Sequence, residues 1–230
     1  MNTLPEIKQA MKALHPNART ELLDWMAVNL DVGMFVTEPP MAYGAVALER
    51  DFYSLAEYLE LEENSSMAYE YIAGRVYAMA EPSQAHEMIA MNLQTAIHTH
   101  LDGQPCRVHS AARRIQFKCR GNDIAYRPDV WVGCGDKRNP KGVVMGDPRL
   151  VIEILSPSTA RTDRQEKAVN YREIPSLEEC ILVAQKNALV TIYRRAEEWQ
   201  PVMIDSPHGT LELRSIGLEL PLARVYHAVS

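Results

Sequence analysis

One carboxylate, Glu153, interrupts an apolar run at residues 150–155. Every other residue of the run is Leu, Ile or Val, which is typical of a strand buried on both faces of a sheet. An unpaired carboxylate is costly to hold away from water, and it must be paired or neutralised there. We therefore expect a cation, a metal ion or a group of hydrogen-bond donors to face Glu153, which becomes the first candidate functional residue.

A second acid, Asp129, precedes another apolar run of strand type, Val130, Trp131 and Val132. If the two runs form neighbouring strands, the two acids face each other. Two carboxylates held close together repel, and a divalent cation relieves that repulsion. Oxygen ligands of this kind suit Mg²⁺ or Mn²⁺ better than zinc, so the pattern indicates a metal site.

The composition is that of an ordinary globular protein: 230 residues, 47% hydrophobic and 23% charged. This length suits one domain, or one domain with an appendage, and can bury a core without staples. We expect a cytoplasmic protein, because neither a membrane span nor the layout of a secretory signal is present. The four cysteines form no Cys-x-x-Cys pair and are expected to be ordinary thiols.

The formal net charge of −6 argues against a protein that coats nucleic acid by bulk electrostatics. A local basic groove is still compatible with the sequence, and a solvated charged face is the alternative. The basic residues concerned are Arg107, Arg113, Arg114, Lys118, Arg120, Arg127, Lys137, Arg138 and Lys141.

Residues 1–48 are predicted to form a helical extension and linker, and residues 49–230 the main α/β domain. In that domain, Ser54 and Glu57 are spaced as a capping box, and Ser83 is placed to cap a long helix. The predicted helices cover 54–61, 84–101 and 163–173. The predicted strands cover 69–72, 75–79, 107–118, 124–132, 150–155, 179–184 and 189–194, with shorter pieces at 199–204 and 211–214.

Several motifs in order carry a family resemblance. The segment 127–130, the run 150–159 and then Asp163, Lys167 and Tyr171 resemble a large bacterial family of restriction-endonuclease-like proteins. That family is abundant in cyanobacteria and has the PD-(D/E)XK nuclease fold. The hairpin 69–79 followed by His86 is also similar to it, and the likeness covers roughly residues 50–225.

The resemblance implies an α+β core in which a mixed β-sheet is flanked by helices. It also implies that Asp129 and Glu153 are metal ligands, with Glu70 as a further acid. In the superfamily a lysine normally follows the second acid by two residues, but Leu155 stands there. The resemblance makes Lys167, on the following helix, the substitute. Ala73 and Ala112 stand where the family often carries acids, a loss that bears on a second metal site.

The expected function is a Mg²⁺- or Mn²⁺-dependent endonuclease acting on DNA, with Asp129, Glu153, Glu70 and Lys167 as site residues. A homodimer is expected from the resemblance, since cutting two strands often requires two sites. The first alternative is a catalytically degenerate fold that binds nucleic acid or a protein. The second is a hydrolase of a smaller phosphate ester.

Each site residue also has a plainer interpretation. Glu153 can belong to a structural ion pair, with Lys167 or Arg127, and Asp129 can satisfy backbone N–H groups at a strand start. Lys167 can be a solvated helix lysine, with Lys118 as the other candidate ammonium. Glu70 can be an edge-strand charge. His86 lies either within reach of the site or simply in the first turn of its helix.

Overall fold

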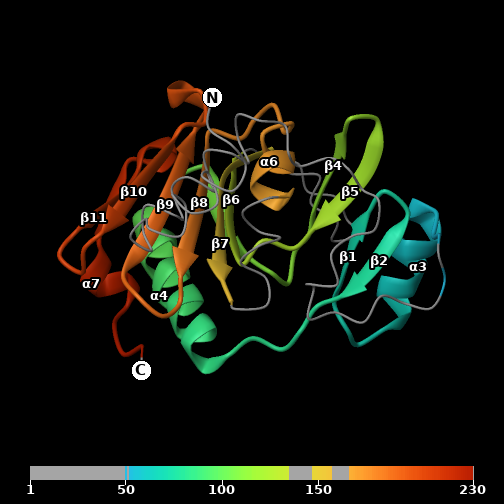
Figure 1. Cartoon of the computed structure of the whole chain (residues 1–230), viewed down its shortest axis with the longest axis horizontal. Helices are drawn as coiled ribbons and strands as arrows, with labels where there is room; N and C mark the ends of the chain where they lie inside the picture. Colours follow the sequence, from blue (N-terminus) through green and yellow to red (C-terminus); the bar gives the residue numbers. More distant parts are fainter. Residues whose placement is uncertain (1–49, 51, 135–146, 157–165, 230) are drawn as a thin grey trace, which may run out of the picture.

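The computed structural model describes residues 50, 52–134, 147–156 and 166–229 (Figure 1). The predicted extension at 1–48, the basic residues Lys137, Arg138 and Lys141, and Asp163 lie outside these ranges. In the part that the structure describes, no helix is both long and apolar enough to cross a membrane.

Within the described residues, two main sheets and one small hairpin form the β-structure (Figure 1). The four-stranded sheet has the order β2 (Arg75–Ala78), β1 (Tyr69–Ile72), β5 (Asn122–Tyr126) and β4 (Ile115–Cys119). The six-stranded sheet has the order β10 (Pro201–Asp205), β9 (Leu189–Arg194), β8 (Glu179–Ala184), β7 (Pro148–Leu155), β6 (Val130–Cys134) and β3 (Cys106–Ser110). The hairpin pairs β11 (Thr210–Leu213) with β12 (Leu218–Pro221). β7 and β8 are parallel, so the larger sheet is mixed, as predicted.

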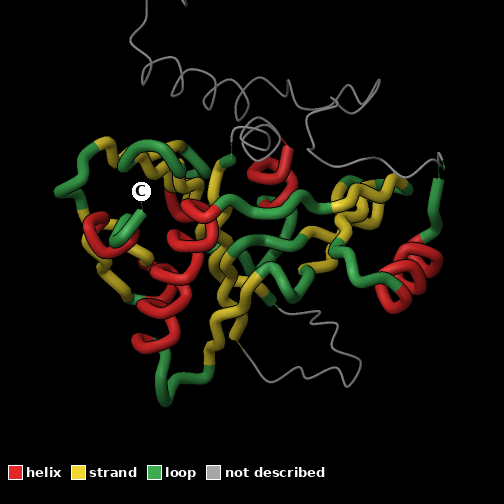
Figure 2. The backbone as a smooth tube through the Cα atoms, turned by 90° about the horizontal axis from the view of Figure 1, so that it is seen from below, coloured by secondary structure: helices red, strands yellow, loops and turns green. Residues whose placement is uncertain are grey.

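Short and long helices surround these sheets (Figure 2). They are α3 (Leu55–Asn64), α4 (Gln84–His100), α6 (Ala168–Tyr171) and α7 (Leu222–Val225), with 3₁₀ turns η2 (Arg195–Glu197) and η3 (Arg214–Ile216). Both predicted caps are confirmed. The Ser54 backbone N–H donates to Glu57 Oε2 over 2.7 Å while Ser54 Oγ accepts from the Glu57 N–H. At the start of α4, Ser83 Oγ accepts from the His86 N–H.

α4 packs on one face of the six-stranded sheet through the stripe that the sequence predicts. Ile89, Leu93 and Ile97 are completely buried there, and α7 and the β11–β12 hairpin join the same core. A second core, on the opposite face, contains residues of β4, β5 and α6. Helix α3 covers the β1–β2 hairpin in a third, smaller core.

The central strand β7 contributes to both faces of its sheet, as the apolar run predicts. Ile152 and Ile154 enter the core around α4, whereas Val151 and Leu155 enter the core around α6. Side chains alternate along a strand, so Glu153 lies on the α6 face together with Val151 and Leu155. The strand therefore directs one carboxylate into the core that contains α6.

Two of the predicted strands are each broken in two. The prediction of continuous strands at 107–118 and 124–132 is wrong, because the chain bends at 111–114 and again at 127–129. On one side of the bends, β3 pairs with β6 in the six-stranded sheet. On the other side, β4 pairs with β5 in the four-stranded sheet. Pro128 lacks an N–H for a ladder, and the Arg113 N–H turns back to Ser110 O over 3.0 Å. This long ribbon thus links both sheets.

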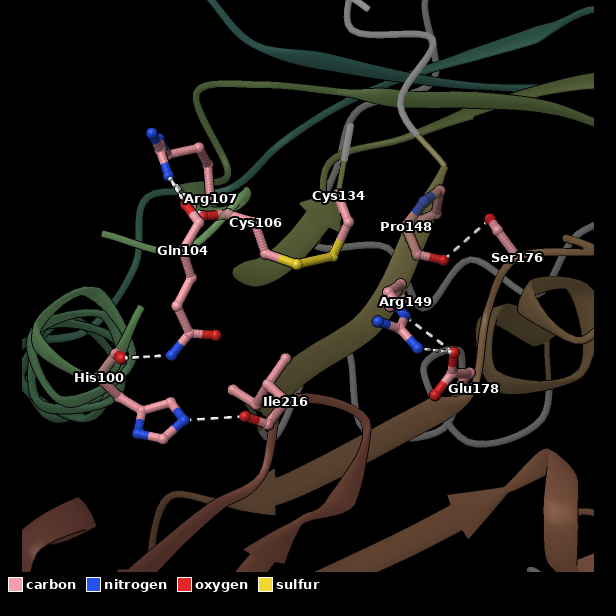
Figure 3. The surroundings of a disulfide bond; sticks show 10 residues. All are labelled: His100, Gln104, Cys106, Arg107, Cys134, Pro148, Arg149, Ser176, Glu178 and Ile216. Carbon is pink, nitrogen blue, oxygen red and sulfur yellow. Dashed lines mark hydrogen bonds and ion pairs between the residues drawn. A yellow bond between two sulfur atoms is a disulfide. The ribbon is translucent and has the colours of Figure 1, made fainter. Parts of the chain in front are cut away.

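The prediction of four ordinary thiols is also wrong. Cys106 on β3 and Cys134 on β6 stand directly opposite each other and form a disulfide (Figure 3). Cys119 and Cys180 are buried and form no disulfide, as predicted. The bonded pair is 28 residues apart in sequence, so only the pairing of β3 with β6 brings the two together.

Candidate active site

Glu153 has both a cation and a hydrogen-bond donor beside it. Its side chain is 3% exposed. The Tyr171 hydroxyl donates to Glu153 Oε1 over 2.7 Å, and Lys167 Nζ lies 3.6 Å from the same oxygen. Burial, and then the charges of Glu153 and Glu70, raise the pKa of Tyr171 well above its usual value. Tyr171 therefore remains a protonated donor at physiological pH.

Glu70 meets the same ammonium from the other sheet. Its Oε1 accepts from Lys167 Nζ and from the Arg127 backbone N–H, both at 2.9 Å. β1 has neighbours on both sides, β2 and β5, and Glu70 is 2% exposed. The interpretation of Glu70 as an edge-strand charge is therefore wrong.

Lys167 joins the two acids and hence the two sheets. Its side chain is 7% exposed, and its ammonium also lies over the Tyr126 ring, 5.4 Å from the centroid. The interpretation of Lys167 as a solvated helix lysine is wrong. The other candidate, Lys118, is 67% exposed and pairs with Asp123 in the β4–β5 hairpin. Of these two candidate lysines, Lys167 is the one that contacts the acids.

Asp129 lies at the start of β6, on the strand next to that of Glu153. The register pairs Val130 with Ile152, so Asp129 stands opposite Glu153 where the ladder ends. Asp129 Oδ2 accepts from the Ile154 N–H over 2.7 Å, and Oδ1 lies 3.0 Å from His86 Nε2. Asp129 thus satisfies a backbone N–H, as its plainer interpretation holds, and also contacts the first turn of α4.

A cluster behind the site holds the bends of the long ribbon in place. Glu62 of α3 accepts from Arg127 Nη2 over 2.8 Å and from Nε over 3.1 Å, and it also pairs with Arg114. Arg127 Nη1 donates to the carbonyl oxygens of Ala111 and Ala112, both over 2.9 Å. The bend at 127–129 is therefore hydrogen-bonded through Arg127 to the bend at 111–114 and to α3. These bonds hold the Arg127 backbone N–H next to Glu70.

The same cluster changes the interpretation of the basic stretch. Arg114 and Arg127 form ion pairs with Glu62, and Lys118 forms an ion pair with Asp123. Arg113 and Arg120 are exposed on the bend and on the β4–β5 turn. The described part of the stretch does not present all its charges to one groove.

Further polar residues extend the site. The Tyr126 hydroxyl donates to Glu166 Oε1 over 2.9 Å and accepts from Asn170 Nδ2 over 2.8 Å. Gln185 Nε2 lies 3.4 Å from His86 Nδ1. Nothing in the local spacing of Glu62, Asn170 and Gln185 distinguishes them from surface polar residues, so the sequence does not predict these contacts.

The carboxylate oxygens at this site are ligands of the kind that suits a hard divalent cation. Asp129, Glu153 and Glu70 offer carboxylate oxygens, the ligands that Mg²⁺ and Mn²⁺ prefer. Within the described ranges, no group of three or more potential ligands is already gathered for a metal ion. Glu70 and Glu153 instead share the Lys167 ammonium.

Comparison with known proteins identifies the family of this chain. The model of the Uma2 family, described as "Putative restriction endonuclease", matches residues 55–223. The chain belongs to the Uma2 family. That match spans α3, both main sheets, α4 and α6, so the acids and Lys167 all lie within the family region.

Two Synechocystis proteins are similar to this Uma2 chain. The protein slr1290 is 31% identical over 76% of this chain and 91% of its own length. The protein sll1609 is 26% identical over 63% of this chain and 82% of its own. Both carry the name "Uncharacterized protein". What they support is membership of the family and the occurrence of this family in cyanobacteria.

A solved structure shows the same fold. A "putative nuclease belonging to DUF820" from Anabaena variabilis superposes with a TM-score of 0.63 and 21% sequence identity. The match covers 76% of this chain and 97% of that one. The predicted restriction-endonuclease-like α+β fold is confirmed.

Proposed function

We propose that this Uma2 protein is a Mg²⁺- or Mn²⁺-dependent endonuclease that hydrolyses phosphodiester bonds in DNA. The observation that carries the proposal is the buried cluster of Glu70, Glu153 and Lys167, contributed by both sheets and the residue just before α6. A nuclease family model over most of the domain supports the reaction class. A homodimer would supply a second site for the second strand.

Each site residue has a role in this proposal. Asp129, Glu153 and Glu70 would hold the cation. When bound, the cation would act as a Lewis acid and lower the pKa of a bound water. Lys167 would stabilise the negative charge that develops on the phosphate. Tyr171 donates to Glu153 Oε1 and so fixes the orientation of that carboxylate.

The alternative function is a binding module that keeps the nuclease fold without cutting. One observation favours it: Lys167 is already paired with Glu70 at 2.9 Å, and Leu155 occupies the usual lysine position. In this interpretation the ion pair is a structural link between the sheets. A nucleic acid or a protein would then be bound elsewhere on the surface.

Plasmid cleavage tests the two functions. The full chain is incubated with supercoiled DNA in Mg²⁺, in Mn²⁺ and with a chelator, beside the variant Glu153→Gln. Glu87→Gln, the same change at an exposed position on α4, is the matched control. We expect cutting by the wild type and the control only when metal is present, and none by Glu153→Gln.

Unfolding by urea shows whether each variant is folded under assay conditions. Equal cutting by Glu153→Gln and wild type would exclude Glu153 as a ligand and point to a contaminating nuclease. If the folded wild type cuts under no condition, the binding module is the better function.

A further inference from the structure

A chain of polar side chains leads from the start of α4 to Asp129. His86 Nε2 lies 3.0 Å from Asp129 Oδ1, and the two side chains are 17% and 12% exposed. On the other side of the ring, Gln185 Nε2 lies 3.4 Å from His86 Nδ1. Gln185 follows β8 directly, so this chain connects α4, β8 and the start of β6.

Ser83 sets the direction of the hydrogen bonds. Its Oγ accepts from the His86 N–H as the helix cap and donates to Gln185 Oε1 over 2.8 Å. An amide oxygen can only accept, so the hydroxyl must be the donor. The Gln185 side chain is thereby oriented with its amide nitrogen toward the imidazole.

This direction determines where the imidazole carries its hydrogen. An amide nitrogen only donates, so His86 Nδ1 is the acceptor in this contact. The ring hydrogen then lies on Nε2, which donates to Asp129 Oδ1. With the Ile154 N–H on Oδ2, each oxygen of Asp129 has a donor, one from α4 and one from β7.

We propose that His86 is a positioning residue, held by Ser83 and Gln185 with its ring hydrogen on Nε2 so that it fixes the Asp129 carboxylate. The inference rests on the proposed nuclease function for its catalytic meaning. Groups that orient a ligand are worth as much as ten- to a hundredfold in metal affinity or activity. Asp129 needs such support because it stands where the β6–β7 ladder ends.

The tautomer is measured first, and independently of activity. In the ¹⁵N-labelled full chain, long-range ¹H–¹⁵N correlation spectra identify which imidazole nitrogen of His86 carries hydrogen. We expect hydrogen on Nε2 in the wild type and a shift toward a mixture of tautomers in Gln185→Leu. Hydrogen on Nδ1 in the wild type would overturn the proposed direction of the chain.

Binding of Mn²⁺ alone, by calorimetry, then tests the positioning role. Leu at position 86 cannot donate, whereas the amide of Gln reaches about as far as Nε2. We expect His86→Leu to bind Mn²⁺ about 10- to 100-fold more weakly and to lose cleavage in parallel. His86→Gln should recover most of both. His98→Leu, on an exposed face of α4, is the matched control.

The outcomes separate this inference from the function on which it rests. Wild-type affinity in His86→Leu, or equal loss in His86→Gln, would overturn the positioning role while leaving the nuclease intact. If the wild type neither binds Mn²⁺ nor cuts, the nuclease proposal fails. In that case the position of the His86 ring hydrogen alone tests whether His86 orients Asp129, and the two residues form a structural pair.

Discussion

The hydroxyl of Tyr171 donates to Glu153 Oε1 over 2.7 Å, and both side chains are buried. The relationship explains how a four-residue helix serves the site. Lys167 and Tyr171 lie one turn apart at α6, so one short element presents an ammonium and a hydroxyl to the same carboxylate. The loss of either group should therefore be measurable by itself.

Tyr171→Phe removes a donor to a charged acceptor. We expect it to lower the free energy of unfolding by about 1.5 to 3 kcal/mol, the range for hydrogen bonds to charged groups. The comparison is Tyr226→Phe, whose hydroxyl donates to the neutral Ala184 carbonyl over 2.8 Å. That change should cost only about 0.5 to 1.5 kcal/mol. Urea unfolding measures both, and a larger loss at Tyr226 would contradict the role of charge.

Lys167→Met leaves two buried carboxylates without their shared cation. Breaking a buried pair in this way costs about 3 to 5 kcal/mol. A divalent cation can relieve the same repulsion, so Mg²⁺ or Mn²⁺ should raise the melting temperature of the variant more than that of the wild type. Thermal unfolding with metal and with a chelator checks this expectation.

The control for this change is Lys118→Met, where the ammonium is 67% exposed. An exposed pair of this kind is worth about 0 to 1 kcal/mol. If metal stabilises Lys167→Met no more than Lys118→Met, then Glu70 and Glu153 do not share a cation site.

Glu62→Gln should destabilise the fold by removing the charge that pairs with Arg127 and Arg114. The Glu62 side chain is 4% exposed, so the two guanidinium groups are left without their anion, at a cost of about 3 to 5 kcal/mol. The matched change is Glu178→Gln, whose pair with Arg149 is about 40% exposed. That change should cost about 0 to 1 kcal/mol in the same urea titration. Equal costs would mean that the ribbon bends do not depend on Glu62.

Reduction of the Cys106–Cys134 disulfide should lower stability by about 2 to 4 kcal/mol, because the bond restricts the unfolded chain. Urea unfolding with and without dithiothreitol measures this, and the double variant Cys106→Ser with Cys134→Ser should behave like the reduced wild type. Insensitivity of the wild type to the reductant would show that the two thiols are not bonded in solution.

The sequence predicts the parts of this fold whose signals are local. The capping box at Ser54, the stripe of α4 and the buried run around Glu153 each depend on residues a few positions apart, and all three are confirmed. The resemblance added Glu70 and favoured Lys167 over Lys118, and the structure pairs Lys167 with both Glu70 and Glu153. Their role in binding metal stays a prediction.

What the sequence could not predict depends on long-range pairing. Alternation of side chains looks the same in a straight strand and in one that bends between two sheets, so the breaks at 111–114 and 127–129 were missed. The disulfide follows only from the register of β3 on β6. Gln185 and Glu62 reach the site from elements that lie far away in sequence, and their polar side chains carry no local mark of that contact.

His109 makes stability depend on pH in the mildly acidic range. Burial, and then the charge of Arg113, lower the pKa of His109 below its usual 6.5, and the ring lies against Trp131 with centroids 4.1 Å apart. The unfolded chain therefore binds a proton more readily than the folded one. Stability is retained above pH 6.5 and falls as the pH drops below it.

His109→Phe keeps an aromatic ring against Trp131 and removes the titrating group. We expect the urea midpoint of the wild type to fall between pH 7.5 and pH 5.5, and that of the variant to fall less. His98→Phe, at an exposed position on α4, controls for the loss of one histidine. An equal decline in wild type and His109→Phe would assign the acid sensitivity to other groups.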